Sequence, residues 1–307
     1  MKLSTNSSSI TFLASPITDR RSCMELTSGL QRLQWDPDLG GRLVSWRVSD
    51  LELLPRRSND PIEFGMYPMA PWAGRVRGNE ITAESLRRMG VEAAETLNLS
   101  VNYHPWALHG TCFTAPVDSM IATDNTVVSR QVIPRWPWAA ELINTWTITD
   151  DGMDVTMTVH AQEATPVLLG WHPWFQRELR GSSVEWAMNS STMSVRSDSL
   201  PTDEWLTIED TSGPYDDVFH CPDKRVDLTW PAVLSLSVTS SHPWFVVFDE
   251  QPDAMCIEPQ THLPNAWNDP LAGEPGVASP GSDVTLTTQW RWSMDGIPSM
   301  LHRDASV

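Results

Sequence analysis

Three copies of the tripeptide His-Pro-Trp hold the residues of this 307-residue chain that are best suited to acid/base chemistry. The copies begin at His104, His172 and His242. Histidine is the side chain that gains or loses a proton near neutral pH, so it is the first candidate for a catalytic acid or base. The residues that flank the copies share nothing else. We therefore do not interpret them as an internal repeat, and each copy has to be judged separately.

The middle copy and a distant glutamate have the strongest local context. His172 follows the apolar run 167–170, which we expect to be a buried strand that delivers the imidazole to a cleft, with Pro173 ending the strand pairing. The alternative is a structural histidine held by hydrogen bonds. Glu258 follows the apolar run 254–257, and a carboxylate at the end of a buried strand is costly unless it is paired or used. The alternative there is a surface turn.

Further polar groups lie in segments rich in turn-forming residues, and each is a weak signal alone. They are Arg75 and Arg77 beside Trp72, His109 before a glycine, and the adjacent pair Asp216 and Asp217. Loop arginines are mostly solvated, adjacent aspartates mostly form turns, and a His-Gly pair is common.

The elements that must position these groups are strands. In the segment 146–161, Met153, Val155, Met157 and Val159 alternate with polar residues after a turn at Asp151-Gly152, which predicts a β-hairpin. Similar patterns occur at 42–48, 233–241, 244–250 and 282–292. Short strands along the whole chain predict a large all-β antiparallel sandwich or barrel, with about fifteen or more strands. We expect one domain over 1–307, with 1–24 as an irregular extension and 294–307 as a tail.

Composition narrows the classes of partner. A formal net charge of −18 and a pI near 4.7 argue against nucleic acid, an anionic membrane surface and a strongly anionic substrate. The 4 cysteines are scattered without metal-like spacing, which predicts free thiols in a reducing compartment. The chain shows no signal-peptide core and no stretch long enough to span a bilayer, so we expect a cytoplasmic enzyme or binding protein. The 16 tryptophans suit core packing, although indole faces also stack on sugar rings.

The order of the motifs is more specific than any one of them: "PW..R", "LHG", "HPWF" after an apolar strand, "YDDVF", then "EPQ". This order resembles the aldose 1-epimerase (galactose mutarotase) family from about residue 38 to residue 293. The resemblance implies a large antiparallel β-sandwich of the supersandwich type. It implies interconversion of sugar anomers, with Glu258 as base, His172 as acid, Arg75 and His109 as sugar contacts and Asp216 as a hydroxyl-binding residue. It implies a small sugar as the partner and no metal or cofactor.

Two expectations about the site follow. An imidazolium beside a carboxylate would raise the pKa of the histidine and lower that of the glutamate. The chain also departs from the family pattern, with Trp171 and Trp174 flanking the catalytic histidine and Gly74 replacing an asparagine before the arginine. These changes predict a more aromatic pocket, in which Trp72, Trp171 or Trp174 stacks on the sugar.

Other functions stay open at this point. One is a non-catalytic sugar-binding sandwich. Another is a glycoside hydrolase or lyase that pairs Asp216 or Asp217 with Glu258, since hydrolases need two carboxylates. A third is a sugar-phosphate mutarotase that uses a basic cluster formed by Arg75, Arg77, Arg87 and Arg88. We expect a supporting role for His104 and a structural one for His242. The oligomeric state is left open.

Overall fold

The computed structural model describes residues 23–189, 192–208, 213–269 and 273–294, and in these ranges it is an antiparallel β-sandwich of two large sheets. The eleven-stranded sheet has the spatial order β1 (Met24–Ser28), β2 (Gln31–Asp36), β3 (Arg42–Val48), β5 (Met66–Met69), β13 (Gly170–Gln176), β23 (Ala254–Gln260), β22 (Trp244–Phe248), β19 (Asp216–His220), β17 (Thr192–Ser197) and β18 (Leu200–Thr207), with β4 (Leu51–Glu52) paired to β3. The all-β fold predicted from the sequence is confirmed.

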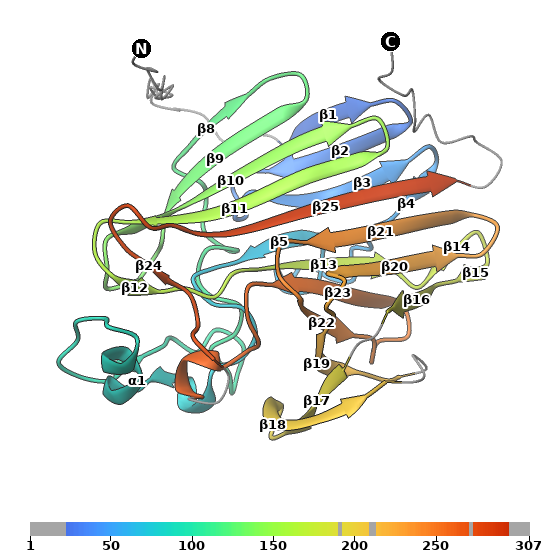
Figure 1. Ribbon diagram of the computed structural model, residues 1–307. Coiled ribbons are helices and arrows are strands. Elements are labelled where there is room, and N and C mark those ends of the chain that lie inside the picture. The colour runs from blue at the N-terminus through green and yellow to red at the C-terminus, as the bar shows by residue number, and fades with distance from the viewer. Residues whose placement is uncertain (1–22, 190–191, 209–212, 270–272, 295–307) are drawn as a thin grey trace, which may run out of the picture.

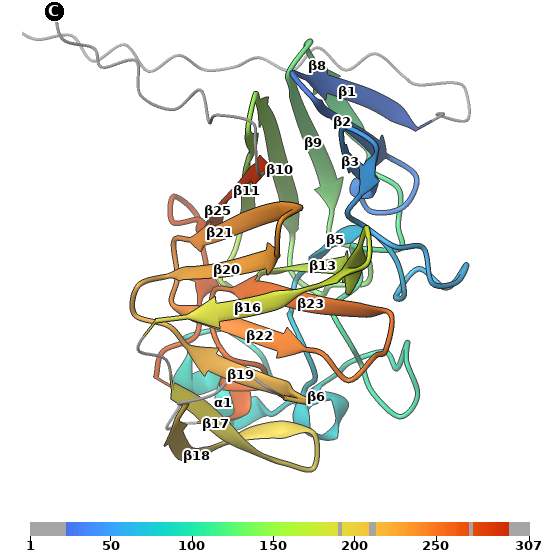
Figure 2. The same ribbon diagram turned by 90° about the vertical axis from the view of Figure 1, so that its right-hand side faces the viewer.

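The eight-stranded sheet forms the second layer (Figures 1 and 2). Its order is β16 (Glu185–Met188), β20 (Arg225–Trp230), β21 (Leu234–Ser240), β25 (Val284–Met294), β11 (Gly152–Ala161), β10 (Ala140–Thr149), β9 (Thr126–Val132) and β8 (Ser119–Ala122). Three short pairs complete the strands: β6 (Glu80–Ile81) with β7 (Leu97–Asn98), β12 (Thr165–Pro166) with β24 (Val277–Ala278), and β14 (Glu178–Leu179) with β15 (Ser182–Ser183).

The predicted hairpin is present as β10 and β11. Buried and half-buried residues alternate along both strands, as expected when one face packs on the core. Thr149 pairs with Gly152, so the turn consists of Asp150 and Asp151 and lies one residue before the predicted one. The predicted strands at 42–48, 233–241, 244–250 and 282–292 correspond to β3, β21, β22 and β25.

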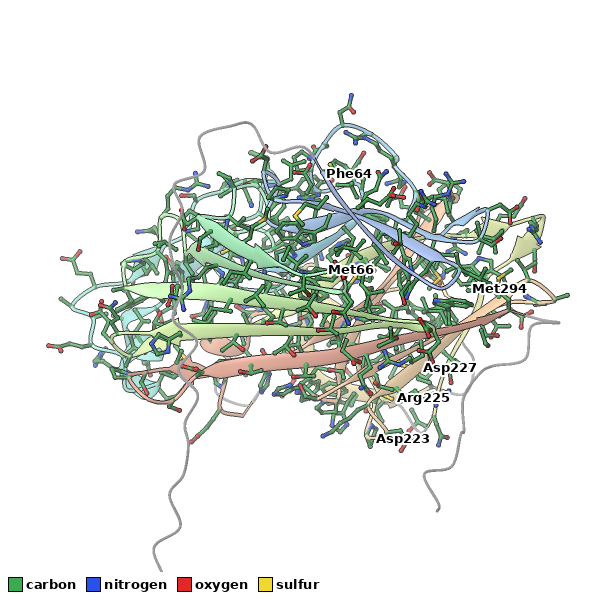
Figure 3. The ribbon with its side chains drawn as sticks, turned by 90° about the horizontal axis from the view of Figure 1, so that it is seen from above. Phe64, Met66, Asp223, Arg225, Asp227 and Met294 are labelled. Atoms are coloured by element: carbon green, nitrogen blue, oxygen red, sulfur yellow. The ribbon has the colours of Figure 1, made fainter. Side chains whose placement is uncertain are left out.

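Tryptophans fill the space between the sheets. Trp146 of β10 meets Trp171 of β13 edge to face, with ring centroids 4.7 Å apart, and Trp292 of β25 donates to Gln31 of β2 at 3.3 Å. Seen from above, Met66 of β5 lies near the middle of the molecule, while Arg225 and Asp227 lie nearer its edge (Figure 3). The two sheets therefore share one indole-rich core.

One end of the molecule carries the only α-helix of the described residues. Helix α1 (Ala83–Arg88) begins after Thr82, whose side chain accepts from the Ser85 N–H at 3.1 Å. The 3₁₀ helix η1 (Arg77–Asn79) precedes α1 in the chain, and the 3₁₀ helix η2 (Ala266–Asn268) contacts α1. Helix α1 lies at the same end of the molecule as β17 and β18 (Figures 1 and 2). Within the described ranges, no helix is both long enough and apolar enough to cross a bilayer.

The predicted ends of the domain fall mostly outside the described residues. Met24 belongs to β1 and Met294 to β25, so both strands reach into the segments expected to be irregular. The organisation as one domain stays a prediction.

Candidate active site

His172 and Glu258 lie opposite each other on neighbouring strands in the middle of the larger sheet. Strands β13 and β23 pair Gly170 with Gln260 and Trp174 with Cys256, so the register places His172 across from Glu258. The imidazole Nε2 is 3.3 Å from Glu258 Oε1, and the two side chains are 6% and 4% exposed. Two residues that are 86 positions apart in the sequence thus form one buried acid/base pair.

Both residues were predicted at strand ends, and that part of the prediction is wrong. They lie inside strands that are buried over almost their whole length, with one face on the core and the other on the site. Pro173 does not end β13, because pairing with β23 resumes at Trp174 and Pro173 itself lies opposite Met66 of β5. A strand can pass a proline at a position where its missing N–H is not required.

Aromatic rings fix the orientation of the His172 imidazole. Tyr67, its partner across β5, stacks on it with centroids 4.6 Å apart and an interplanar angle of 13°. His109 meets it edge-on at 4.7 Å, and Trp174 lies at 5.3 Å. The Trp174 indole is itself held by a 2.9 Å hydrogen bond to the Ile62 carbonyl. The ring therefore has little freedom to turn away from Glu258.

Burial sets the pKa of both groups, in the direction opposite to the prediction. Loss of water around His172 lowers its pKa from 6.5 to about 3. Burial raises the pKa of Glu258 well above its usual value, and Asp216 raises it further. Desolvation disfavours each charged form and outweighs the attraction expected between the two. The resting pair is therefore shifted toward a neutral imidazole beside a neutral carboxyl group.

His109 is placed as a neutral hydrogen-bond donor. Its ring Nδ1 accepts from the Gly74 N–H at 3.2 Å, and the His109 backbone N–H donates to the Gly74 carbonyl at 3.1 Å. Burial lowers its pKa well below the usual value. The proton of the neutral ring is therefore on Nε2. Gly74 has φ +69°, and a Cβ there would lie 2.7 Å from Pro264 Cγ, which explains glycine at this position.

Asp216 is held between two arginines. Its Oδ2 lies 3.0 Å from Arg75 Nη1 and 2.8 Å from Arg196 Nη1. Arg196 also reaches Asp217 at 3.5 Å and Glu250 at 3.4 Å. Burial raises the pKa of Asp216, while the two arginines oppose that rise. This network forms a polar wall of hydrogen-bond donors and acceptors on one side of the site.

A hollow of about 140 Å³ connects these groups. It is lined by His172, Glu258, Arg75, His109, Asp216 and Trp174 among others, so six of the seven predicted site residues meet there. Trp72 is the exception. It is 1% exposed, packs against Trp136 and donates to the Ala107 carbonyl, so it belongs to the core. Trp171 is likewise fully buried among core residues.

The sequence interpretation missed several residues of the hollow. Arg196, Gln260 and Arg57 line it. Gln260 donates to Glu258 Oε2 at 3.3 Å, and the Arg57 guanidinium lies 5.0 Å from the Trp174 ring. Gln260 was visible in the "EPQ" motif, whereas nothing in the local sequence around Arg196 distinguishes it from a solvated arginine. Of the other two tripeptide copies, His104 is exposed and His242 bonds to Ser241, at 2.9 Å.

One group of side chains could hold a cation. Donor atoms of His172, Cys256 and Glu258 lie within 4.8 Å of one another, all buried. Burial, followed by Glu258, raises the pKa of Cys256 well above its usual value, so the thiolate that a metal requires is disfavoured. All four cysteines are free thiols.

Known proteins of similar structure share this fold. They include a candidate aldose 1-epimerase from Escherichia coli K12, with TM-score 0.75 and 18% identity over 89% of this chain and 99% of that chain. A galactose mutarotase-like protein from Clostridium acetobutylicum has TM-score 0.74 and 16% identity over 89% and 95% of the two chains. A GalM/aldose epimerase homologue from C. elegans has TM-score 0.72 and 15% identity over 89% and 99%.

No curated protein matches the chain. The sequence pattern of the aldose 1-epimerase family, in contrast, matches residues 36–291 and so covers most of it. That span includes every residue of the hollow described above. The chain belongs to the aldose 1-epimerase family.

Proposed function

We propose that this protein is a mutarotase that opens and recloses an aldopyranose ring, with Glu258 as base and His172 as acid. The observation that supports this most directly is the 3.3 Å contact between His172 Nε2 and Glu258 Oε1, at the edge of a hollow lined by polar groups. Isomerase activity follows from the family as a class, and the particular reaction and residues are our proposal.

The proton balance of the pair suits this chemistry. A neutral imidazole beside a carboxylic acid carries the same number of protons as an imidazolium beside a carboxylate, so one proton transfer across the contact interconverts them. From the ion-pair form, Glu258 takes the proton of the anomeric hydroxyl while His172 protonates the ring oxygen. The C1–O5 bond breaks and a carbonyl forms at C1. Rotation about the C1–C2 bond and the reverse steps give the other anomer.

Burial favours this direction of proton transfer. Ring opening converts the ion pair to the neutral pair, and the pKa shifts of both groups favour the neutral forms. The remaining groups would orient the sugar: His109 through Nε2–H, Arg75 and Asp216 through the polar wall, and Trp174 through its indole face.

The arginines of the hollow favour a neutral sugar over a sugar phosphate. Arg75 and Arg196 pair with Asp216, and Arg57 pairs with Asp253 at 3.0 Å. Each arginine lining the hollow is therefore already neutralised by a carboxylate. A glycoside hydrolase would use a second carboxylate in place of the imidazole that faces Glu258 here. A cytoplasmic location stays a prediction.

Polarimetry tests the proposal. Freshly dissolved α-D-glucose, α-D-galactose, xylose, arabinose and glucose 6-phosphate should be compared with and without the protein. Glu258→Gln and His172→Asn should each slow mutarotation by roughly 10²–10⁴-fold. His242→Asn is the matched control and should leave the rate nearly unchanged. A wild-type protein that accelerates none of these sugars would support the non-catalytic binding alternative, and release of reducing ends from an oligosaccharide would support a hydrolase.

A further inference from the structure

A second hollow lies next to the first on the same face of the larger sheet, and neighbouring rows of residues on β19, β22 and β23 line the two. Val218, Val246 and Glu258 form one row across β19, β22 and β23, and His220, Trp244 and Gln260 form the next. Side chains two residues apart on a strand point to the same face, about 7 Å further along. Gln260 lines the first hollow, and the other two residues of its row line the second.

Flat rings form much of the second hollow, which has a volume of about 400 Å³. Trp244 stacks on His262 with centroids 5.2 Å apart and an interplanar angle of 20°. His220 lies 4.8 Å and Trp205 5.9 Å from the Trp244 ring. Trp205 comes from the edge strand β18 and Trp244 from β22.

These two tryptophans are unusual in this protein. All of its tryptophans lie within the described ranges, and only Trp106, Trp205 and Trp244 among them are not buried. Trp205 is 36% exposed. An indole left partly in water keeps part of its apolar surface uncovered, and two in one hollow provide a surface for a ligand ring.

The polar groups of the second hollow suit a neutral, hydroxyl-rich ligand. Asp203 and Asp269 supply carboxylates, and Thr192 and Thr202 supply hydroxyl groups. In the described part of the chain, no residue that lines this hollow is a lysine or arginine. A phosphate or a uronic acid would meet acidic groups there without a cation to compensate. Indole faces beside carboxylates are the combination that binds an uncharged sugar.

We propose that the second hollow binds the non-reducing ring of a reducing disaccharide whose reducing ring occupies the first hollow. This proposal rests on the proposed mutarotase function and specifies its substrate class. The two hollows lie on one sheet face, and Gln260, which lines the first, is paired with Trp244, which lines the second. The displacement of one row along the strands is comparable with the length of one sugar ring.

The third His-Pro-Trp copy thereby gains a role through its tryptophan. The middle copy and the third copy place Trp174 and Trp244 on the same face of the sheet, one in each hollow. In both copies the residue that contacts a sugar ring would be the tryptophan, whereas only His172 would take part in proton transfer.

Two measurements test the proposal. Polarimetry gives kcat/KM for α-D-glucose and for maltose, cellobiose and lactose, each with a free anomeric centre. Isothermal titration calorimetry gives Kd for the same equilibrated sugars without relying on catalysis. The variants are Trp244→Ala, Trp205→Ala and the conservative Trp244→Phe. Leu206→Ala is the matched control, since Leu206 is exposed on the same strand but does not line the hollow.

We expect at least one disaccharide to bind more tightly than glucose. Each alanine variant should lower the ratio of disaccharide to glucose kcat/KM, and weaken disaccharide binding, by about three- to tenfold, the range of one aromatic stacking contact. Trp244→Phe should retain most of the ratio, and Leu206→Ala all of it. An unchanged ratio in both alanine variants, or equal affinity of the wild type for glucose and all three disaccharides, would overturn the second site. Failure of the mutarotase proposal is distinct, because then no sugar is interconverted while the calorimetric preference still reports on this hollow.

Discussion

Replacing His172 by asparagine should make the protein more resistant to acid relative to the wild type. The reason is the buried imidazole, whose pKa falls from 6.5 to about 3 on folding. Below pH 6.5 the His172 imidazole binds a proton in the unfolded chain, whereas in the folded protein it stays neutral down to about pH 3. The free energy of unfolding therefore decreases as the pH drops below the unfolded pKa of 6.5. Asparagine fills a similar space and has no proton to gain.

The magnitude follows from the two pKa values. Each pH unit between them changes the free energy of unfolding by about 1.4 kcal/mol, so the variant should gain about 3 kcal/mol relative to wild type from about pH 7 to about pH 4.5. Glu258 acts in the opposite direction, because its raised pKa removes stability as the pH rises above 4.5. It is present in both proteins, so its contribution cancels in the comparison.

Urea unfolding of both proteins at several pH values measures this difference. His242→Asn is the control for losing a histidine that is half-buried and outside the hollow. If the free energies of unfolding of wild type and His172→Asn change in parallel between about pH 7 and about pH 4.5, the imidazole is not buried in its neutral form, and our account of the pair is incorrect.

Three further predictions concern Gly74, Arg196 and the two tryptophans Trp72 and Trp174. Gly74→Asn should lose about 1–3 kcal/mol of stability because the residue has φ +69° and a proline ring against it, while Gly181→Asn, with φ +78° and open space, should lose less in the same denaturant titration. Arg196→Met should raise KM for the best aldose more than it lowers kcat, since this arginine holds Asp216, the aspartate that we propose binds a sugar hydroxyl group; a fall in kcat alone would place it in the chemical step. Trp72→Phe should lower the melting temperature with KM nearly constant, whereas Trp174→Phe should raise KM, because only the second indole lines the hollow. The reverse pattern would mean that the core indole contacts the sugar.

The sign of the pKa shifts illustrates what pairing alone cannot predict. A histidine next to a glutamate suggests an ion pair when only the two residue types are known. In the folded protein both side chains are almost completely buried, and His172 is enclosed by Tyr67, His109 and Trp174. The cost of removing water then exceeds the attraction between the charges. Such enclosure depends on Tyr67 and His109, rings from two other segments that no local pattern reveals, as well as on Trp174 of the same strand.

Local sequence determined the strands and the candidate residues of this protein. Alternation with a period of two fixes which side chains share a face, so hairpins such as β10–β11 were predictable. The order of motifs, through its resemblance to a known family, predicted His172, Glu258, Arg75, His109 and Asp216 as members of one site. The departures from the family pattern added Trp72 and Trp174 to that prediction. Only the tertiary structure decided that Trp72 and Trp171 pack in the core, that Arg196 joins the polar wall, and that Trp244 lies one row beyond His172 and Glu258. The physical reason is that these outcomes depend on pairing between strands far apart in the chain, such as β17 with β19 and β13 with β23, and such pairing is set by the packing of the whole sandwich.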